Sequence, residues 1–217
     1  MKTTILSIAL LAFTALSFAQ NDSGLSPAKL NVGLTLGTYS FNSDTQDVEI
    51  EYSFSAGFRI GVDFSVYEDE QFDVETGITL TNHRSLVDQP EIGAKINYDI
   101  YWAGSHAILN YHILPQSLSV GAGIFADFGI AGTQQFEGSD KVNVFDEIDG
   151  GDAPLSRLNY GAAFKLNHIM SWTDFADDLY ISYRLGLADI EGADNDTQSF
   201  KTGMISIGVR STFENLF

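Results

Sequence analysis

The feature that most constrains the fold is a strict two-residue alternation in the last hairpin of the chain, residues 179–213. A β-strand places successive side chains on opposite faces, so this alternation gives each strand one apolar and one polar face. In the last strand, Ile205, Ile207, Val209 and Phe213 oppose Met204, Ser206, Gly208, Arg210 and Thr212. Such a strand fits a soluble sheet with its apolar face in a core. It also fits a membrane barrel with its apolar face in lipid and its arginines in the lumen.

The first nineteen residues have the layout of a secretory signal peptide. Lys2 forms a short cationic region, an apolar stretch runs to Phe18, and Ser17-Phe18-Ala19 is a small-x-small cleavage site. We expect a signal peptide at 1–19 and one barrel domain at 20–217. A membrane helix at the N-terminus is the weaker alternative, because the apolar run is short and no stop-transfer charge cluster follows. No later stretch is apolar enough for a membrane helix, so the mature chain is a soluble exported protein or a β-barrel.

Eight segments alternate with a period of two residues, and none repeats with the helical period over a useful length. They cover 29–40, 52–66, 72–86, 96–113, 117–133, 157–169 and the two strands of the last hairpin. The fifth has the clearest signal, with Ala131 as the last residue on its non-apolar face. The fourth has an unclear phase before Gly104, where we expect a β-bulge.

The connections between these segments alternate between short and long. The short ones (67–71, 114–116 and 170–178) follow even-numbered strands, and the long ones are 41–51, 87–95, 134–156 and 189–199. Outer-membrane barrels have short periplasmic turns, longer outer loops and an even number of antiparallel strands. The sequence therefore predicts an all-β, eight-stranded, antiparallel up-and-down transmembrane β-barrel. Both termini would lie in the periplasm.

Charged side chains occur on the non-apolar faces, which such a barrel turns toward its lumen. They are Arg59, Asp63, Glu75, Asp127, Lys165, Arg184 and Arg210. An eight-stranded barrel has a narrow interior, and unpaired charges there are costly, so we expect a paired network that plugs the lumen. A gate or ion path is the functional alternative. A soluble lipocalin-like barrel would turn the apolar faces inward, but their large side chains together exceed what so narrow a lumen could hold.

The C-terminal half resembles the PorT-like outer-membrane β-barrel family of Bacteroidetes-type, Gram-negative bacteria. Family members show a Gly-rich strand, here with Gly161, then a Tyr-x-x-Gly-Leu strand, here 183–187, and a last strand ending in an aromatic residue, here Phe213. The first strand, 29–41, also looks like the family's first strand, and the terminal Phe217 resembles the signal read by the barrel assembly machinery. The resemblance implies an integral outer-membrane barrel with no cofactor. The family's namesake belongs to a secretion pathway, which we do not carry over.

The composition limits the partners of the protein. The net charge is −18, so the mature chain without Lys2 has −19, which argues against nucleic acid as a partner. The chain has no cysteine, which excludes disulfides and thiolate chemistry. Acidic residues gather in two long loops, at Glu137, Asp140, Asp146, Glu147, Asp149 and Asp152, and at Asp189, Glu191, Asp194 and Asp196. Divalent cations could bind there, although neither loop has the spacing of a calcium loop.

The remaining candidates are histidines and aromatic residues. His83 with Ser85 and Asp88 could form a rim triad, but there is no nucleophile-elbow motif, and His106, His112 and His168 look isolated. Aromatic side chains could form interfacial girdles: Tyr98, Tyr101, Trp102, Tyr111 and Tyr160. We therefore predict a non-enzymatic outer-membrane barrel with a plugged lumen and acidic extracellular loops. Its role would be structural or adhesive. A narrow solute channel, a lipid-modifying barrel enzyme and a soluble ligand-binding barrel are the alternatives.

Overall fold

A computed structural model describes residues 28–43, 51–89, 94–114, 117–147, 152–170, 176–192 and 198–213 of the chain. The expected signal peptide lies outside these residues. The described chain is almost entirely β-structure. Its strands are β1 (Lys29–Ser43), β2 (Glu51–Glu68), β3 (Phe72–Gln89), β4 (Ala94–Leu114), β5 (Leu118–Phe136), β6 (Val142–Asn143), β7 (Leu158–Ile169), β8 (Asp178–Gly186) and β9 (Gln198–Thr212). In the described part of the chain, no helix is both long and apolar enough to cross a membrane.

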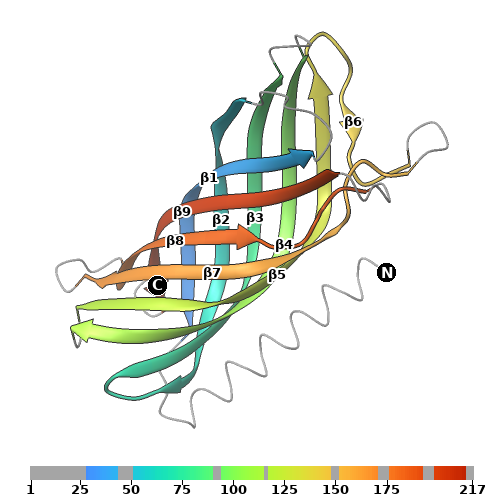
Figure 1. Ribbon diagram of the computed structural model, residues 1–217. Helices are drawn as coiled ribbons and strands as arrows, with labels where there is room; N and C mark the ends of the chain where they lie inside the picture. Colours follow the sequence, from blue (N-terminus) through green and yellow to red (C-terminus); the bar gives the residue numbers. More distant parts are fainter. Residues whose placement is uncertain are drawn as a thin grey trace.

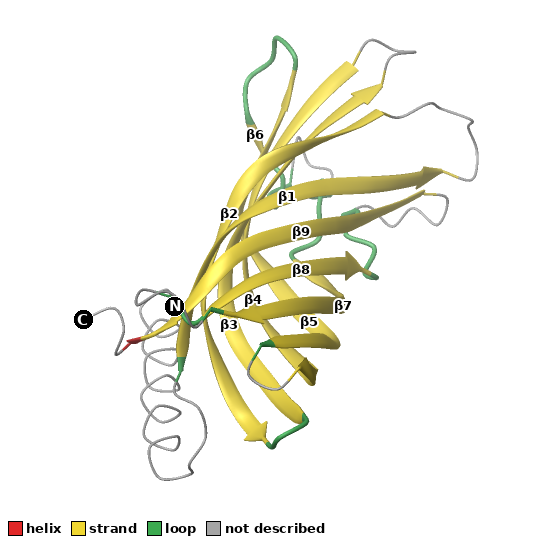
Figure 2. Cartoon of the chain, turned by 90° about the vertical axis from the view of Figure 1, so that its left-hand side faces the viewer, coloured by secondary structure: helices red, strands yellow, loops and turns green. Residues whose placement is uncertain are grey.

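Eight of the strands form a closed antiparallel ring, which confirms the predicted fold (Figure 1). Each strand pairs with its neighbour in sequence, except that β5 is followed in the ring by β7, and the ring closes where β1 pairs with β9 from Lys29↔Thr212 to Ser43↔Gln198. Closure leaves no unpaired sheet edge, which is the condition for a β-structure to cross a membrane. The connections after β2, β4 and β7 lie at one end of the barrel, here called the turn end, and those after β1, β3, β5 and β8 lie at the other, here called the loop end (Figure 2). The predicted alternation of short and long connections is not strict, because only residues 90–93 join β3 to β4, whereas residues 170–177 join β7 to β8.

The two faces of the wall follow the predicted alternation. On the outer face large apolar side chains are exposed, with Leu34 at 69% and Ile124 at 68% of their surface. On the inner face the same strands bury small, polar and charged residues such as Thr35 and Asp127. A soluble protein rarely exposes so many large apolar side chains together. The lipocalin-like reading, with apolar faces inside, is therefore wrong for this structure.

The irregularity expected in the fourth segment lies in the neighbouring strand instead. β4 keeps a regular alternation, whereas β5 carries an extra residue, because Tyr101 pairs with Ala131 and Trp102 with Gly129. Ile130, between these partners, has none of its own. Consequently Ala131 is exposed, contrary to its predicted place on the inner face, and Gly132 takes that place. Because of the extra residue, side chains after the bulge point to the face opposite to the one that strict alternation predicts, while the strand itself continues.

An apolar cluster lies at the loop end of the barrel. Its wall residues come from the strands, and its cap comes from the connections after β5 and β8. The buried members are Tyr39, Ile100, Trp102, Val144, Phe145, Leu155, Ala188, Ile190 and Phe200. Tyr98 packs against it, so Tyr98 and Trp102 face inward and are not girdle residues as predicted. Tyr101, Tyr111 and Tyr160 lie on the outer face.

Phe145 anchors the cap on the wall of β5. Its ring meets Trp102 edge-on, with centroids 5.8 Å apart, and Arg157 lies 4.8 Å over its other side. A methyl group at Gly129 would lie 2.2 Å from this ring, so only glycine leaves room for it. The predicted loop 134–156 is thus partly packed structure, held to β5 through β6. The described acidic side chains of this connection remain at its surface.

Candidate functional site

The lumen contains a charge cluster centred on two carboxylates from neighbouring strands. Asp63 on β2 and Glu75 on β3 are both buried, because odd-numbered residues of these strands face inward. Lys165 on β7 and Arg210 on β9 extend into the lumen, and each pairs with both carboxylates. Asp63 also accepts a hydrogen bond of 2.7 Å from the Asn31 amide. These contacts connect the wall across the lumen between strands far apart in sequence.

The sequence analysis missed one carboxylate of this cluster. Asp178 is the first residue of β8, and it pairs with Arg210 Nη2 at 3.1 Å and with Lys29 Nζ at 2.8 Å. It had been assigned to the turn before the strand. The two-residue alternation identifies it, because Asp178 lies six residues before Arg184, and residues an even number apart in a strand share one face.

A second pair lies apart from this cluster. Arg184 on β8 contacts both oxygens of Asp127 on β5, at 3.0 and 3.1 Å, and its other nitrogen lies 3.5 Å from the Thr79 hydroxyl. The guanidinium also lies 5.0 Å from the centre of the Phe125 ring. Both contacts to Asp127 come from the Nη1 atom of Arg184, and charge-assisted hydrogen bonds of this kind are stronger than neutral ones.

The seventh predicted residue, Arg59, has a different environment. Its side chain is 4% exposed, yet no carboxylate of the described residues lies within ion-pair distance. The guanidinium lies 5.9 Å from the centre of the Tyr180 ring. The structure therefore brings six of the seven predicted residues into ion pairs and places Arg59 beside an aromatic ring.

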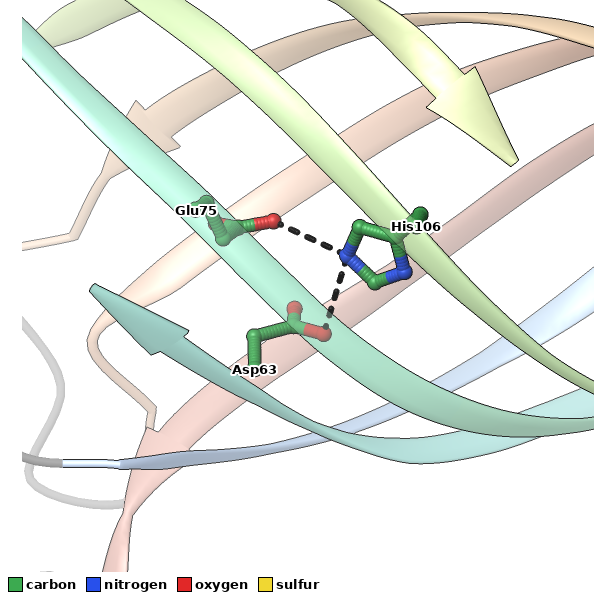
Figure 3. Close-up of side chains that lie close together, drawn as sticks. All are labelled: Asp63, Glu75 and His106. Carbon is green, nitrogen blue, oxygen red and sulfur yellow. Dashed lines mark hydrogen bonds and ion pairs between the residues drawn. The ribbon is translucent and has the colours of Figure 1, made fainter. Parts of the chain in front are cut away.

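His106 completes a group with the geometry of a possible metal site. Its Nε2 atom lies 3.5 Å from Asp63 and 3.4 Å from Glu75, and both carboxylates point toward the ring (Figure 3). The three potential ligand atoms lie within 4.8 Å of one another. However, Lys165 and Arg210 already supply the two positive charges that a divalent cation would bring. The donor set is thus electrically satisfied by side chains and does not call for a metal ion.

A small cavity of about 100 Å³ opens from this cluster toward the turn end. Its lining includes Asp73. The carboxylate of Asp73 accepts a hydrogen bond of 2.7 Å from the Asn110 amide and lies 3.1 Å from His112 Nε2. The apolar cluster lies in the lumen toward the loop end. Among the described residues, the lumen is therefore polar toward the turn end and apolar toward the loop end.

The rim triad considered for His83, Ser85 and Asp88 finds no support among the described side chains. The His83 ring stacks on Tyr39 with centroids 4.3 Å apart, and its Nε2 has no hydrogen-bond partner. The Ser85 hydroxyl is likewise buried without a partner. The side chain of Asp88 lies outside the described residues. The arrangement shows no hydrogen bond between the two side chains and offers no activated nucleophile.

Two of the described acidic residues of the long loops accept hydrogen bonds from nearby groups. Asp189 accepts from the backbone N–H groups of Glu191 and Phe200, and Asp146 accepts from the side chains of Asn143 and Arg157. These two carboxylates thus have protein donors rather than a set of converging oxygen ligands. Asp149, Asp194 and Asp196 lie outside the described residues.

Comparison with known structures gives the same architecture. The chain is similar to Neisserial surface protein A, with a TM-score of 0.53 and 16% identity over 88% of this chain and all of that one. It is also similar to the outer-membrane protein OprG from Pseudomonas aeruginosa, with a TM-score of 0.45 and 13% identity over 85% of this chain and 95% of that one. This chain has the fold of an eight-stranded outer-membrane β-barrel. No protein-family model matches the sequence, so the PorT-like resemblance stays a prediction. A search of curated proteins finds no significant relative.

Proposed function

We propose that the protein is an integral outer-membrane β-barrel with a sealed lumen, whose role is structural or adhesive and is carried by its loop end. The observation that carries this proposal is the combination of an apolar outer wall with a lumen that holds buried ion pairs and an apolar cluster. The wall needs lipid around it, and the ion pairs and the cluster lie where a water-filled path would have to run. The proposal includes no enzyme activity and no cofactor.

The interior supports a structural rather than a conducting role. Glu75, Lys165 and Arg210 are held by direct contacts, and a solute would have to break these before it could pass. At the loop end the solute would also have to displace Phe145 from its place beside Gly129. Breaking a buried ion pair by removing one partner costs about 3–5 kcal/mol, so the network resists opening.

The orientation that we propose places the turn end and both termini in the periplasm, and the loop end outside the cell. Short periplasmic turns and long outer loops are the rule for bacterial barrels. Lipid would contact the belt that includes Leu34 and Ile124, and the barrel assembly machinery would insert the chain. The family that the sequence resembles, the PorT-like barrels, fits this placement.

Membrane fractions and planar bilayers test the proposal. The protein should remain in the membrane through a carbonate wash, and an unboiled sample should migrate differently from a boiled one on a detergent gel. Purified protein in a planar bilayer should give no discrete conductance steps. Conductance in the wild type would favour the channel alternative, and release by carbonate without a mobility shift would contradict the membrane barrel itself.

A further inference from the structure

Arg59 is a buried cation without a counter-ion in the part of the chain that the structure describes. The other buried or half-buried lumenal cations each contact a carboxylate: Lys29 with Asp178, Lys165 and Arg210 with Glu75, and Arg184 with Asp127. Arg59 has no such contact, and its Nε atom lacks any hydrogen-bond partner. An uncompensated charge in a low-dielectric interior is unfavourable, so this position requires an explanation.

The neighbouring carboxylate cannot supply the missing charge. Asp127 directs both of its oxygens to Arg184. Among the described residues, no carboxylate lies within ion-pair distance of Arg59, so its charge has no direct counter-ion there.

The tyrosine whose ring faces Arg59, Tyr180, has an unpartnered hydroxyl group. Tyr180 is 2% exposed, and its hydroxyl has no hydrogen-bond partner. The side chain reaches from β8 across β9 to β1, since methyl groups placed at Gly208 and Gly33 would lie 2.8 and 2.6 Å from the hydroxyl oxygen. Gly33 pairs directly with Arg59 across β1 and β2. Gly33 and Gly208 thus leave room for the Tyr180 side chain, whose hydroxyl ends beside Gly33, the residue that pairs with Arg59.

We propose that Arg59 and the Tyr180 hydroxyl form a binding site for one small monovalent anion, with chloride as the physiological occupant. The anion would accept hydrogen bonds from the Arg59 Nε–H and from the Tyr180 hydroxyl, neither of which has an acceptor among the described residues. A single negative charge would match the charge of Arg59. A bulky organic anion is excluded, because the site is buried between the apolar cap and the ion-pair cluster.

Urea unfolding of the mature protein in phospholipid vesicles tests the site. The unfolding equilibrium constant is compared in potassium chloride and in potassium gluconate at equal ionic strength. Binding to the folded state alone lowers this constant by the factor 1 + [Cl⁻]/Kd, which is about elevenfold when chloride is ten times Kd. The dependence on chloride should disappear in Arg59→Met and weaken in Tyr180→Phe. It should persist in Arg84→Met, which removes an exposed arginine on the outer face.

Equal unfolding in both salts for the wild type would overturn the proposal, as would a chloride effect that survives Arg59→Met. If Arg59→Met does not fold, bromide-soaked crystals of the wild type decide the question. An anomalous scattering peak beside Arg59 is the expected result, and saturating bromide without a peak there would overturn the site. Neither experiment depends on whether the barrel conducts or adheres.

Discussion

Replacement of Ile124 by arginine tests the contact of the outer wall with lipid. Ile124 is 68% exposed and lies in the middle of the apolar outer face of β5, which extends from Leu118 to Ile130. At about 3.3 Å per residue, some 20 Å of strand separates it from each end of that face. In a barrel with strands tilted by about 40°, this places Ile124 near the midplane of an apolar band about 25 Å tall.

An arginine on the lipid face at the midplane costs about 2–4 kcal/mol, and near the interfaces about 0–1 kcal/mol. The folding equilibrium constant of Ile124→Arg should therefore fall roughly 30- to 1,000-fold, at 1.4 kcal/mol per factor of ten. The matched control is Ile113→Arg, the same exchange at the turn end of β4, where the loss should stay below about tenfold. Urea titration in vesicles, followed by tryptophan fluorescence, measures both. Equal and small losses at the two positions would refute the lipid contact.

Three further predictions concern the lumen, the cap and a turn. Glu75→Gln should destabilise the barrel by about 3–5 kcal/mol in the same titration, whereas Arg84→Gln, at an exposed pair, should cost less than about 1 kcal/mol. Gly129→Ala should displace Phe145, and limited proteolysis should then cut the connection after β5 faster than in the wild type. The Tyr67 hydroxyl and two backbone N–H groups lower the pKa of Asp69 in the β2–β3 turn, so an NMR titration should show its carboxylate ionised at lower pH than in a free peptide. Because the pKa of Asp69 is lower in the folded than in the unfolded chain, its carboxylate stabilises the turn at pH values above the unfolded-state pKa. This contribution is lost as the pH falls through the folded-state pKa.

The wall of the barrel was predictable because its physical requirement repeats every two residues. Lipid on one face and a packed lumen on the other leave a pattern that is local in sequence, as around Ile124. The cap was not predictable, because Val144 and Phe145 lie in an acidic stretch without periodicity. Their burial depends on a groove beside Gly129 that exists only once the ring has closed.

The residues that face the lumen were predictable from the two-residue alternation along each strand. The ion pairs that they form were not. Alternation placed Arg59, Arg184 and Asp127 on the inner face. Which cation meets which carboxylate depends on the tilt and stagger of strands across the lumen, and these quantities have no local signature. The isolation of Arg59 and the membership of His106 in the cluster are results of that three-dimensional arrangement.

Spin labels on β5 test the central account most directly. Because the chain has no cysteine, single cysteines can be placed at the even positions from Val120 to Phe128 and at the odd positions Ser119 and Phe125. Gly121 and Gly123 are avoided, since a Cβ there would lie 2.1 and 2.0 Å from its nearest neighbour. In vesicles, labels at even positions should collide with oxygen, which concentrates in lipid, and not with a water-soluble nickel chelate. Labels at odd positions should be shielded from oxygen, because they face the packed lumen. A lipid-embedded barrel would be contradicted if labels at even positions collided with the nickel chelate. It would also be contradicted if collision with oxygen showed no two-residue period along β5.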